Sequence, residues 1–213
     1  MIADIIKEIE KISGDYSGYE IFSDWVKATA IGITNGSDMI RGKVWKKREE
    51  QYKDLVRKHG AEKMKTFADM TGMLCIALEE NMEDVLGRIY MEAGLGSKQT
   101  GQFFTPFHIS HMIARIRMGE ADEKEPVVLN EPSCGGGGMI IAAAKVLKEQ
   151  GIDYQRIMKV TAQDLDWKGV YMTYVQLSLL GISATVIQGD TLAAGAVSKE
   201  QILYTPKKKG MLL

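Results

Sequence analysis

The chain has 213 residues, a net charge of −1 and an ordinary globular composition, with 45% hydrophobic and 26% charged residues. This length supports a sizeable core in one large or two small domains, and the near-neutral charge gives no global basic field of the kind that marks nucleic-acid or membrane binding. The two cysteines are too few for a disulfide framework, and no leader or run of about 18 apolar residues is visible, so we expect a cytoplasmic protein.

The first part of the chain has the composition of helices. No proline occurs before Pro106, and helix-forming residues are abundant. Apolar residues recur at helical spacing over 2–12 and again over 62–92, while the charged stretch 42–59 predicts a solvated helix. We therefore predict a helical N-terminal region over residues 1–93, followed by a glycine-containing connector.

The pattern changes to α/β after Pro126. Three short segments rich in β-branched residues, at 127–131, 158–163 and 183–189, predict buried strands. Two helical segments that end at a glycine, 138–151 and 167–181, alternate with them. This alternation is typical of a parallel sheet with right-handed crossovers. We therefore predict an α/β domain over residues 94–213, with a parallel sheet of three to four strands.

A run of four glycines, in NEPSCGGGGM (130–139), follows the first predicted strand. A strand, a glycine turn and a helix together present free backbone N–H groups to a ligand of the nucleotide type. The phosphate loop of nucleotide hydrolases is excluded, because Met139 and Ile140 stand where Lys and Ser/Thr are needed. The dinucleotide-binding fingerprint fits poorly, because Ile140 replaces its third glycine.

The stretch NEPSCGGGG resembles motif I of the S-adenosylmethionine-dependent amino-methyltransferases, in the DNA adenine-N6 branch. It looks most like the modification subunits of type I restriction systems and their phage-borne relatives. GQFFTPFHIS (101–110) resembles the motif that precedes motif I, and TAQDLDW (161–167) and QGDTL (188–192) follow at predicted strand ends. The resemblance covers roughly residues 85–192 and implies a Rossmann-like class I methyltransferase domain, here truncated.

The resemblance implies a binding site for S-adenosylmethionine. Asp164 would accept hydrogen bonds from the ribose hydroxyls, and Leu165 would cover one face of the adenine ring. Asp190 would accept from the adenine amino group, and Glu131 would lie near the methionine end. The other expected cofactor contacts are Phe104, Thr105, Pro106, Pro132, Gly135 and Gly137. From the residues themselves, Thr105 is expected to cap a helix that begins at Pro106.

The sequence contains no Asn/Asp-Pro-Pro-aromatic motif, which in the family activates the adenine amino group and stacks on the flipped base. By position alone, Tyr204, Thr205 and Pro206 stand in its place as the catalytic residues. The basic residues 207–209 then either contact phosphate or form a solvated tail. The resemblance therefore implies methyl transfer to adenine N6 in DNA if the protein is active. The alternative is a catalytically silent relative that acts as a regulator or partner subunit.

A parallel sheet of three to four strands leaves an open edge, which we expect the helical region, the tail or a second protomer in a two-fold dimer to cover. A truncated gene product is the other explanation for a sheet with so few strands. His108 and His111 could ligate a metal but lack a partner set, so no metal is expected. Cys134 is expected to pack as a small residue rather than act as a nucleophile. Trp45 and the basic residues 46–48 could touch nucleic acid, although a solvated helix face is the simpler interpretation.

Overall fold

The structure is a computed structural model that describes residues 1–95, 104–193 and 195–210. Most of the predicted connector, and the first three residues of the segment 101–110, lie outside the described residues. Among the helices that the structure describes, none is long and apolar enough to cross a membrane.

Four helices form the N-terminal part, as expected, but their boundaries differ from the prediction. They are α1 (Ile2–Ser13), α2 (Gly18–Gly36), α3 (Lys43–Glu80) and α4 (Val85–Glu92). Helix α3 joins the two predicted helices of this region and bends at Gly60, whose φ of 71° lies in the left-handed region that suits glycine. The predicted helix over 62–92 is interrupted before α4, because the Asp84 side chain accepts a hydrogen bond from Gly87 N–H and starts a new helix there.

The three predicted strands are present in the predicted places. They are β1 (Val127–Glu131), β2 (Met158–Asp164) and β3 (Ser183–Gln188), and they pair in parallel in the order β1-β2-β3. A short fourth strand, β4 (Ile202–Tyr204), pairs antiparallel with β3, so the sheet is not parallel throughout. The described residues between β3 and β4 form a loop with a short 3-10 helix at Lys199–Gln201, and no crossover helix lies among them, which allows the antiparallel direction.

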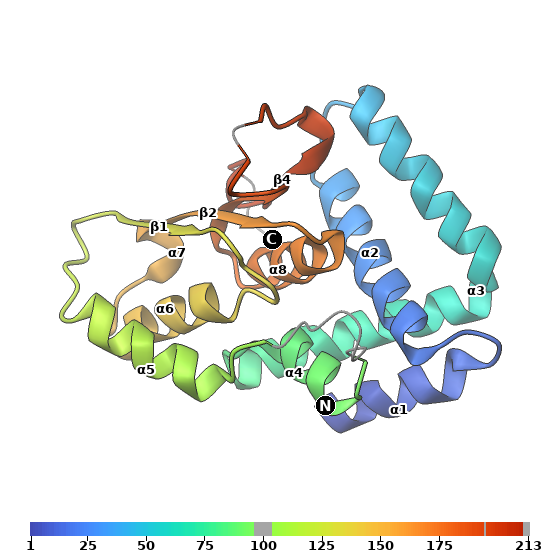
Figure 1. The fold of residues 1–213 in the computed structure, drawn as a ribbon, viewed down its shortest axis with the longest axis horizontal. Coiled ribbons are helices and arrows are strands. Elements are labelled where there is room, and N and C mark those ends of the chain that lie inside the picture. The colour runs from blue at the N-terminus through green and yellow to red at the C-terminus, as the bar shows by residue number, and fades with distance from the viewer. Residues whose placement is uncertain (96–103, 194, 211–213) are drawn as a thin grey trace.

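Helices cover one face of the sheet. Helices α6 (Gly138–Glu149) and α8 (Trp167–Leu179) connect the parallel strands and lie together below the sheet in Figure 1, with α5 (Phe107–Met118) packed against α6 and the short α7 (Tyr154–Ile157) leading into β2. On the opposite face, alternate residues of the strands are exposed, and Val128 has 76% of its surface accessible. Parallel sheets are ordinarily covered on both faces, so this face is unusual.

One continuous hydrophobic core joins the helical part to the sheet. It includes Trp25 of α2, Leu74 of α3, Leu86 of α4 and Val175 of α8, all fully buried, together with the inward residues of the strands. Helix α2 packs directly against α8 (Figure 1). The tail, through β4, covers the β3 edge of the sheet, and the tail is one of the three coverings that we expect from the sequence. Among the described residues, β1 has no strand on its other side.

Candidate functional site

The loops after the three parallel strands meet at the carboxyl end of the sheet. Cys134 N–H donates to Gln163 O at 2.9 Å, which joins the loop after β1 to the end of β2. Thr191 Oγ1 donates to Pro132 O at 2.6 Å, which joins the loop after β3 to the same turn. Ligands of open α/β sheets bind at this end of the strands. The structure therefore brings Glu131, Pro132, Gly135, Asp164, Leu165 and Asp190 into one region.

Asp164 organises the centre of this region. Its Oδ2 accepts from Gly135 N–H at 2.8 Å, and its Oδ1 accepts from Asp166 N–H at 2.9 Å. Each carboxylate oxygen has two acceptor positions, so both oxygens keep one for a ligand hydroxyl. The carboxylate thus fixes the glycine turn and the start of α8 while remaining available to bind.

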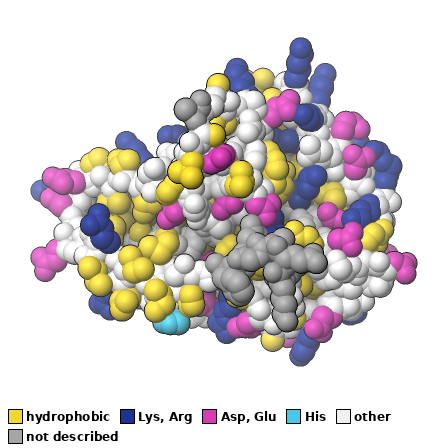
Figure 2. All heavy atoms as spheres, in the orientation of Figure 1, with side chains coloured by type: hydrophobic (Ala, Val, Ile, Leu, Met, Phe, Trp, Pro, Cys, Tyr) yellow, Lys and Arg dark blue, Asp and Glu magenta, His cyan; other side chains and the backbone are white. Residues whose placement is uncertain are grey.

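The other acidic residues are also held by their own loops. Glu131 Oε1 accepts from Ser133 N–H at 3.2 Å, and Asp190 Oδ1 accepts from Leu192 N–H at 2.9 Å. Asp190 is exposed, and Leu165 has 68% of its surface accessible. Figure 2 shows acidic side chains gathered in the middle of the viewed face, where the parallel strands end. The site therefore offers hydrogen-bond acceptors together with the exposed apolar side chain of Leu165.

The glycine run is shaped largely by the protein around it. A Cβ at Gly135 would lie 2.8 Å from the Phe104 ring, and one at Gly137 would lie 3.1 Å from Thr173 Oγ1. A Cβ at Gly136 would lie 2.6 Å from both carboxylate oxygens of Asp84. The close approach inferred from the sequence is therefore, at these positions, an approach of the protein's own side chains.

Asp84 is a residue of this region that sequence reasoning missed. It is buried, and its Oδ1 accepts from Gly87 N–H and from Gln176 Nε2, both at 2.8 Å. Gln176 Nε2 also donates to Gly136 O at 2.7 Å, so it joins α8, α4 and the glycine turn. Burial raises the pKa of the Asp84 carboxyl above its usual value. The available signal was an Asp directly before an apolar helical segment, which is typical of a helix cap.

Phe104 reaches the glycine turn, but Thr105 and Pro106 lie at a different cavity. The Phe104 ring packs against Gly135 and, edge-on at 5.2 Å, against Tyr90. Thr105 and Pro106 are exposed and line, with Phe104, a separate cavity of about 560 Å³ between α4 and α5. The expected cap at Thr105 is wrong by one residue. Helix α5 begins at Phe107, and Pro106 is its N-cap residue, with no side-chain hydrogen bond.

Tyr204, Thr205 and Pro206 lie away from the glycine turn. They lie at β4, which forms one edge of the sheet beside β3, whereas the glycine turn follows β1 at the opposite edge. Thr205 is fully buried, its Oγ1 donates to Ile182 O at 2.7 Å, and it accepts from Ala184 N–H at 2.9 Å. The structure does not bring these three residues together with the expected cofactor contacts.

The remaining candidates have local roles. Burial raises the pKa of the Cys134 thiol to about 12, which leaves it un-ionised at neutral pH. His111 Nε2 pairs with Glu149 at 3.1 Å, on the side of α5 that faces α6. Within the described residues, no group of three or more His, Cys, Asp or Glu side chains is placed to hold a metal ion.

Comparison with known proteins decides the family. The model of the family described as N-6 DNA Methylase matches residues 81–205, more than half of the chain. The chain belongs to the N-6 DNA methylase family. The match begins just before α4 and ends at Thr205, so it includes Asp84, the glycine turn and the sheet.

Two curated relatives of this N-6 DNA methylase chain are methylase subunits. The type I restriction enzyme MpnII methylase subunit of Mycoplasma pneumoniae is 26% identical over 211 residues, which cover 94% of this chain and 35% of the relative. The type I restriction enzyme MjaIX methylase subunit of Methanocaldococcus jannaschii is 30% identical over 119 residues, which cover 53% of this chain and 20% of the relative. The chain thus spans about a third of the first relative and a fifth of the second.

A solved structure resembles the chain more distantly. The type I restriction-modification methyltransferase subunit of Streptococcus thermophilus is 14% identical, with a TM-score of 0.48, over 93% of this chain and 41% of that subunit. This score is too low to establish a shared fold. The fold of the N-6 DNA methylase chain is therefore described by its own helices and strands.

Proposed function

We propose that the chain provides the S-adenosylmethionine site of an adenine-N6 DNA methyltransferase of the type I restriction-modification kind. The observation that carries the proposal is the convergence of Glu131, Asp164 and Asp190 on one glycine turn, in a chain of the N-6 DNA methylase family. The length of the curated relatives supports a further proposal, that DNA and partner subunits complete the assembly.

The roles of the site residues follow from their positions. Asp164 accepts the ribose hydroxyls through the free acceptor positions of its oxygens, and the exposed Leu165 covers the adenine ring. Asp190 accepts from the adenine amino group, and Glu131 lies toward the methionine end. Gly135 and Gly137 shape the turn, with Phe104 behind it. When bound, S-adenosylmethionine supplies an electrophilic methyl group on its sulfonium.

The methyl acceptor has no recognised activating group within the 213 residues. Thr205 uses its hydroxyl inside the sheet, and β4 lies on the side of β3 away from β1. We therefore propose that Tyr204, Thr205 and Pro206 have a structural role, and that the group that activates adenine comes from another part of the assembly. A solitary chain then binds the cofactor without transferring its methyl group. A pair of chains related by a two-fold axis remains a proposal for the free edge of β1.

A calorimetric titration with S-adenosylmethionine tests the site. We expect saturable binding, and we expect Asp190→Ala to weaken it by about tenfold, the cost of losing a hydrogen bond to a polar ligand group. The matched control is Asp69→Ala, which removes the same charge from an exposed position on α3 and should change nothing. Absence of binding by the unmodified chain would refute the proposed cofactor site.

A methyl-transfer assay then tests whether the chain that binds the cofactor can also methylate DNA by itself. The chain is incubated with adenine-containing duplex DNA and S-adenosylmethionine that carries a labelled methyl group, and label in the DNA is measured. Binding without transfer agrees with an acceptor group supplied from elsewhere, or with a silent relative that acts as a partner subunit. Transfer by the chain alone would show that an activating group was overlooked.

A further inference from the structure

A second cavity lies between the helical part and the sheet. It has a volume of about 570 Å³ and is walled by α2, the first half of α3, the start of α8 and the segment that leads into β4. Ligand sites commonly occur where two parts of a chain meet, and this volume is in the range of small-molecule sites. None of the residues expected to contact S-adenosylmethionine lines this cavity.

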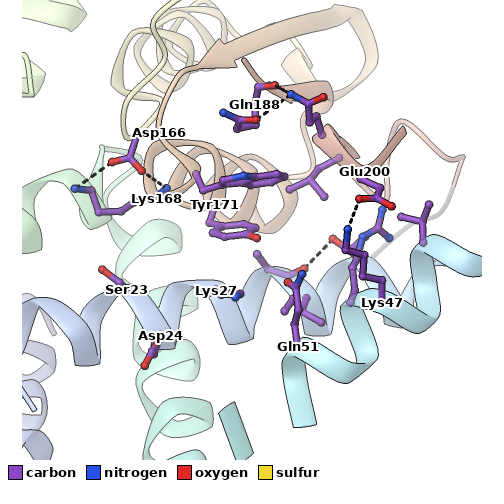
Figure 3. A pocket seen from close by; sticks show the side chains of 18 of the residues that line it. Ser23, Asp24, Lys27, Lys47, Gln51, Asp166, Lys168, Tyr171, Gln188 and Glu200 are labelled. Atoms are coloured by element: carbon purple, nitrogen blue, oxygen red, sulfur yellow. Dashed lines mark hydrogen bonds and ion pairs between the residues drawn. The ribbon is translucent and has the colours of Figure 1, made fainter. Parts of the chain in front are cut away.

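One wall of the cavity is aromatic. Trp167 and Tyr171 are one turn apart on α8, and their rings stack with centroids 5.1 Å apart and planes inclined by 28°. Both side chains line the cavity and are partly exposed. Figure 3 shows Tyr171 above Lys27 of α2, with Gln188 at the far side and Lys47 and Gln51 of α3 opposite. A stacked aromatic pair beside open space is suited to a planar ring.

The charges around this wall are incompletely balanced. Lys47 pairs with Glu200, but the side chain of Lys27 makes no ion pair and no hydrogen bond within the described part of the chain. Arg48 Nη1 forms a long ion pair with Asp38 Oδ2 at 3.8 Å, and that nitrogen is buried without a hydrogen bond. Asp24, the acid nearest to Lys27 in sequence, is already paired with Lys58 at 2.7 Å. The cavity therefore has positive charge left over for an anion.

The third component is a set of side-chain amides. Gln201 Nε2 donates to Gln188 Oε1 at 3.0 Å, and Gln188 Nε2 donates to Leu165 O at 2.8 Å. The side-chain amide of Gln51 on the opposite wall makes no hydrogen bond with any described residue. Amides offer both donors and acceptors, which match the edge of a nucleobase.

From this combination we infer that the cavity between α2, α3 and α8 is a second site that binds a phosphorylated nucleoside, with the base against Trp167 and Tyr171 and the phosphate at Lys27 and Arg48. The ligand is either a free nucleotide or one nucleotide of a single-stranded nucleic acid, because both present the same base and phosphate. The inference does not depend on methyl transfer.

The site also touches the segment that forms the expected cofactor site. Gln188 holds the carbonyl of Leu165, so a ligand in the cavity lies one hydrogen bond away from the residue proposed to cover the adenine of S-adenosylmethionine. A pyrimidine nucleotide is therefore the cleaner probe, because it does not share the adenine of the cofactor.

Quenching of tryptophan fluorescence by thymidine monophosphate tests the inference, with and without saturating S-adenosylmethionine. We expect saturable quenching that Trp167→Leu removes. Lys27→Ala should weaken binding by about tenfold, as expected for loss of a charge-assisted contact. Lys7→Ala is the matched control, because Lys7 is exposed on α1 and does not line the cavity, so its loss should leave binding unchanged. Circular dichroism verifies that each variant is folded.

A series of ligands distinguishes single-stranded nucleic acid from a free nucleotide as the ligand of this cavity. Tighter binding of a short single-stranded oligothymidylate than of the mononucleotide identifies nucleic acid as the source, and equal or weaker binding identifies a free nucleotide. Thymidine alone should bind more weakly than its monophosphate. The inference is overturned if neither phosphorylated probe binds, if inorganic phosphate binds as tightly as the mononucleotide, or if Lys27→Ala behaves like Lys7→Ala.

Discussion

Asp84 shows how one buried carboxylate shapes the glycine turn. It caps α4, accepts from Gln176 on α8, and lies where side chains at positions 136 and 138 would have to go. Burial of a carboxylate is costly, and it is tolerated here because hydrogen bonds from Gly87 and Gln176 hold Oδ1. The turn therefore depends on a residue about fifty positions earlier in the chain as well as on its own glycines.

Gly136→Ala should destabilise the protein. The new Cβ would lie 2.6 Å from both Asp84 oxygens, and Asp84 cannot move without losing its hydrogen bonds. Overpacking of this kind costs about 1–3 kcal/mol, to be measured as the free energy of unfolding in urea. Gly32→Ala on α2 is the control, since nothing lies within 4 Å of its Cβ, and it should raise stability by up to about 1 kcal/mol. Equal effects of the two substitutions would contradict this role of Asp84.

Strand β4 is an element of only three residues, all paired with β3, and the residue that follows it adds further hydrogen bonds to β3. Thr205 N–H donates to Ala184 O at 3.0 Å, and its hydroxyl bonds to Ala184 N–H and Ile182 O. The side chain thereby satisfies backbone groups of β3 that no further strand residue reaches. A strand of three residues is at the short end of the usual range.

Thr205→Val tests this attachment, because valine has nearly the same shape and no hydroxyl. It leaves Ala184 N–H and Ile182 O without their buried partner, so the free energy of unfolding should fall by about 1–3 kcal/mol. Thr185→Val is the control, since Thr185 lies on the exposed face of β3 opposite Tyr204, and it should change stability by less than about 0.5 kcal/mol. If both variants unfold alike in urea, the Thr205 hydroxyl has no such role.

The elements of the α/β part could be predicted from sequence because their signals are local. β1 matches the predicted boundaries, and β2 and β3 differ by one residue, since each strand is a short apolar run between turn residues. The direction of β4 could not be predicted, because three residues carry no usable periodicity. The acids at the strand ends could be predicted, because parallel strands end at one edge, whereas Asp84 and the cavity behind Trp167 depend on packing between distant segments.

At the scale of the whole molecule, the helical part and the sheet share one core. Phe22 and Trp25 of α2 are buried in the same cluster as Val160 of β2 and Val175 of α8. The division into residues 1–93 and 94–213 stays a prediction. The family match begins at residue 81, inside the first of these segments.

A shared core predicts a single unfolding transition. Far-UV circular dichroism and tryptophan fluorescence should give the same urea midpoint, because neither part keeps its core without the other. Trp25→Phe and Trp167→Phe, each combined with Trp45→Phe, leave a single tryptophan reporter in α8 and in α2 respectively. Two separate midpoints would instead support two independent domains.

The contact between residue 209 and α2 has a consequence for how the protein is made. Lys209 Nζ donates to Thr34 O at 3.4 Å and to Ser37 Oγ at 3.2 Å, across about 175 residues of sequence. Synthesis at roughly 5–20 residues per second separates the two ends of this contact by about ten seconds or more. For most of that time α8 has not yet been synthesised, so the side of α2 that packs against α8 in the folded protein has no partner. During translation, the first helices therefore present an apolar surface to which a chaperone can bind before the sheet exists.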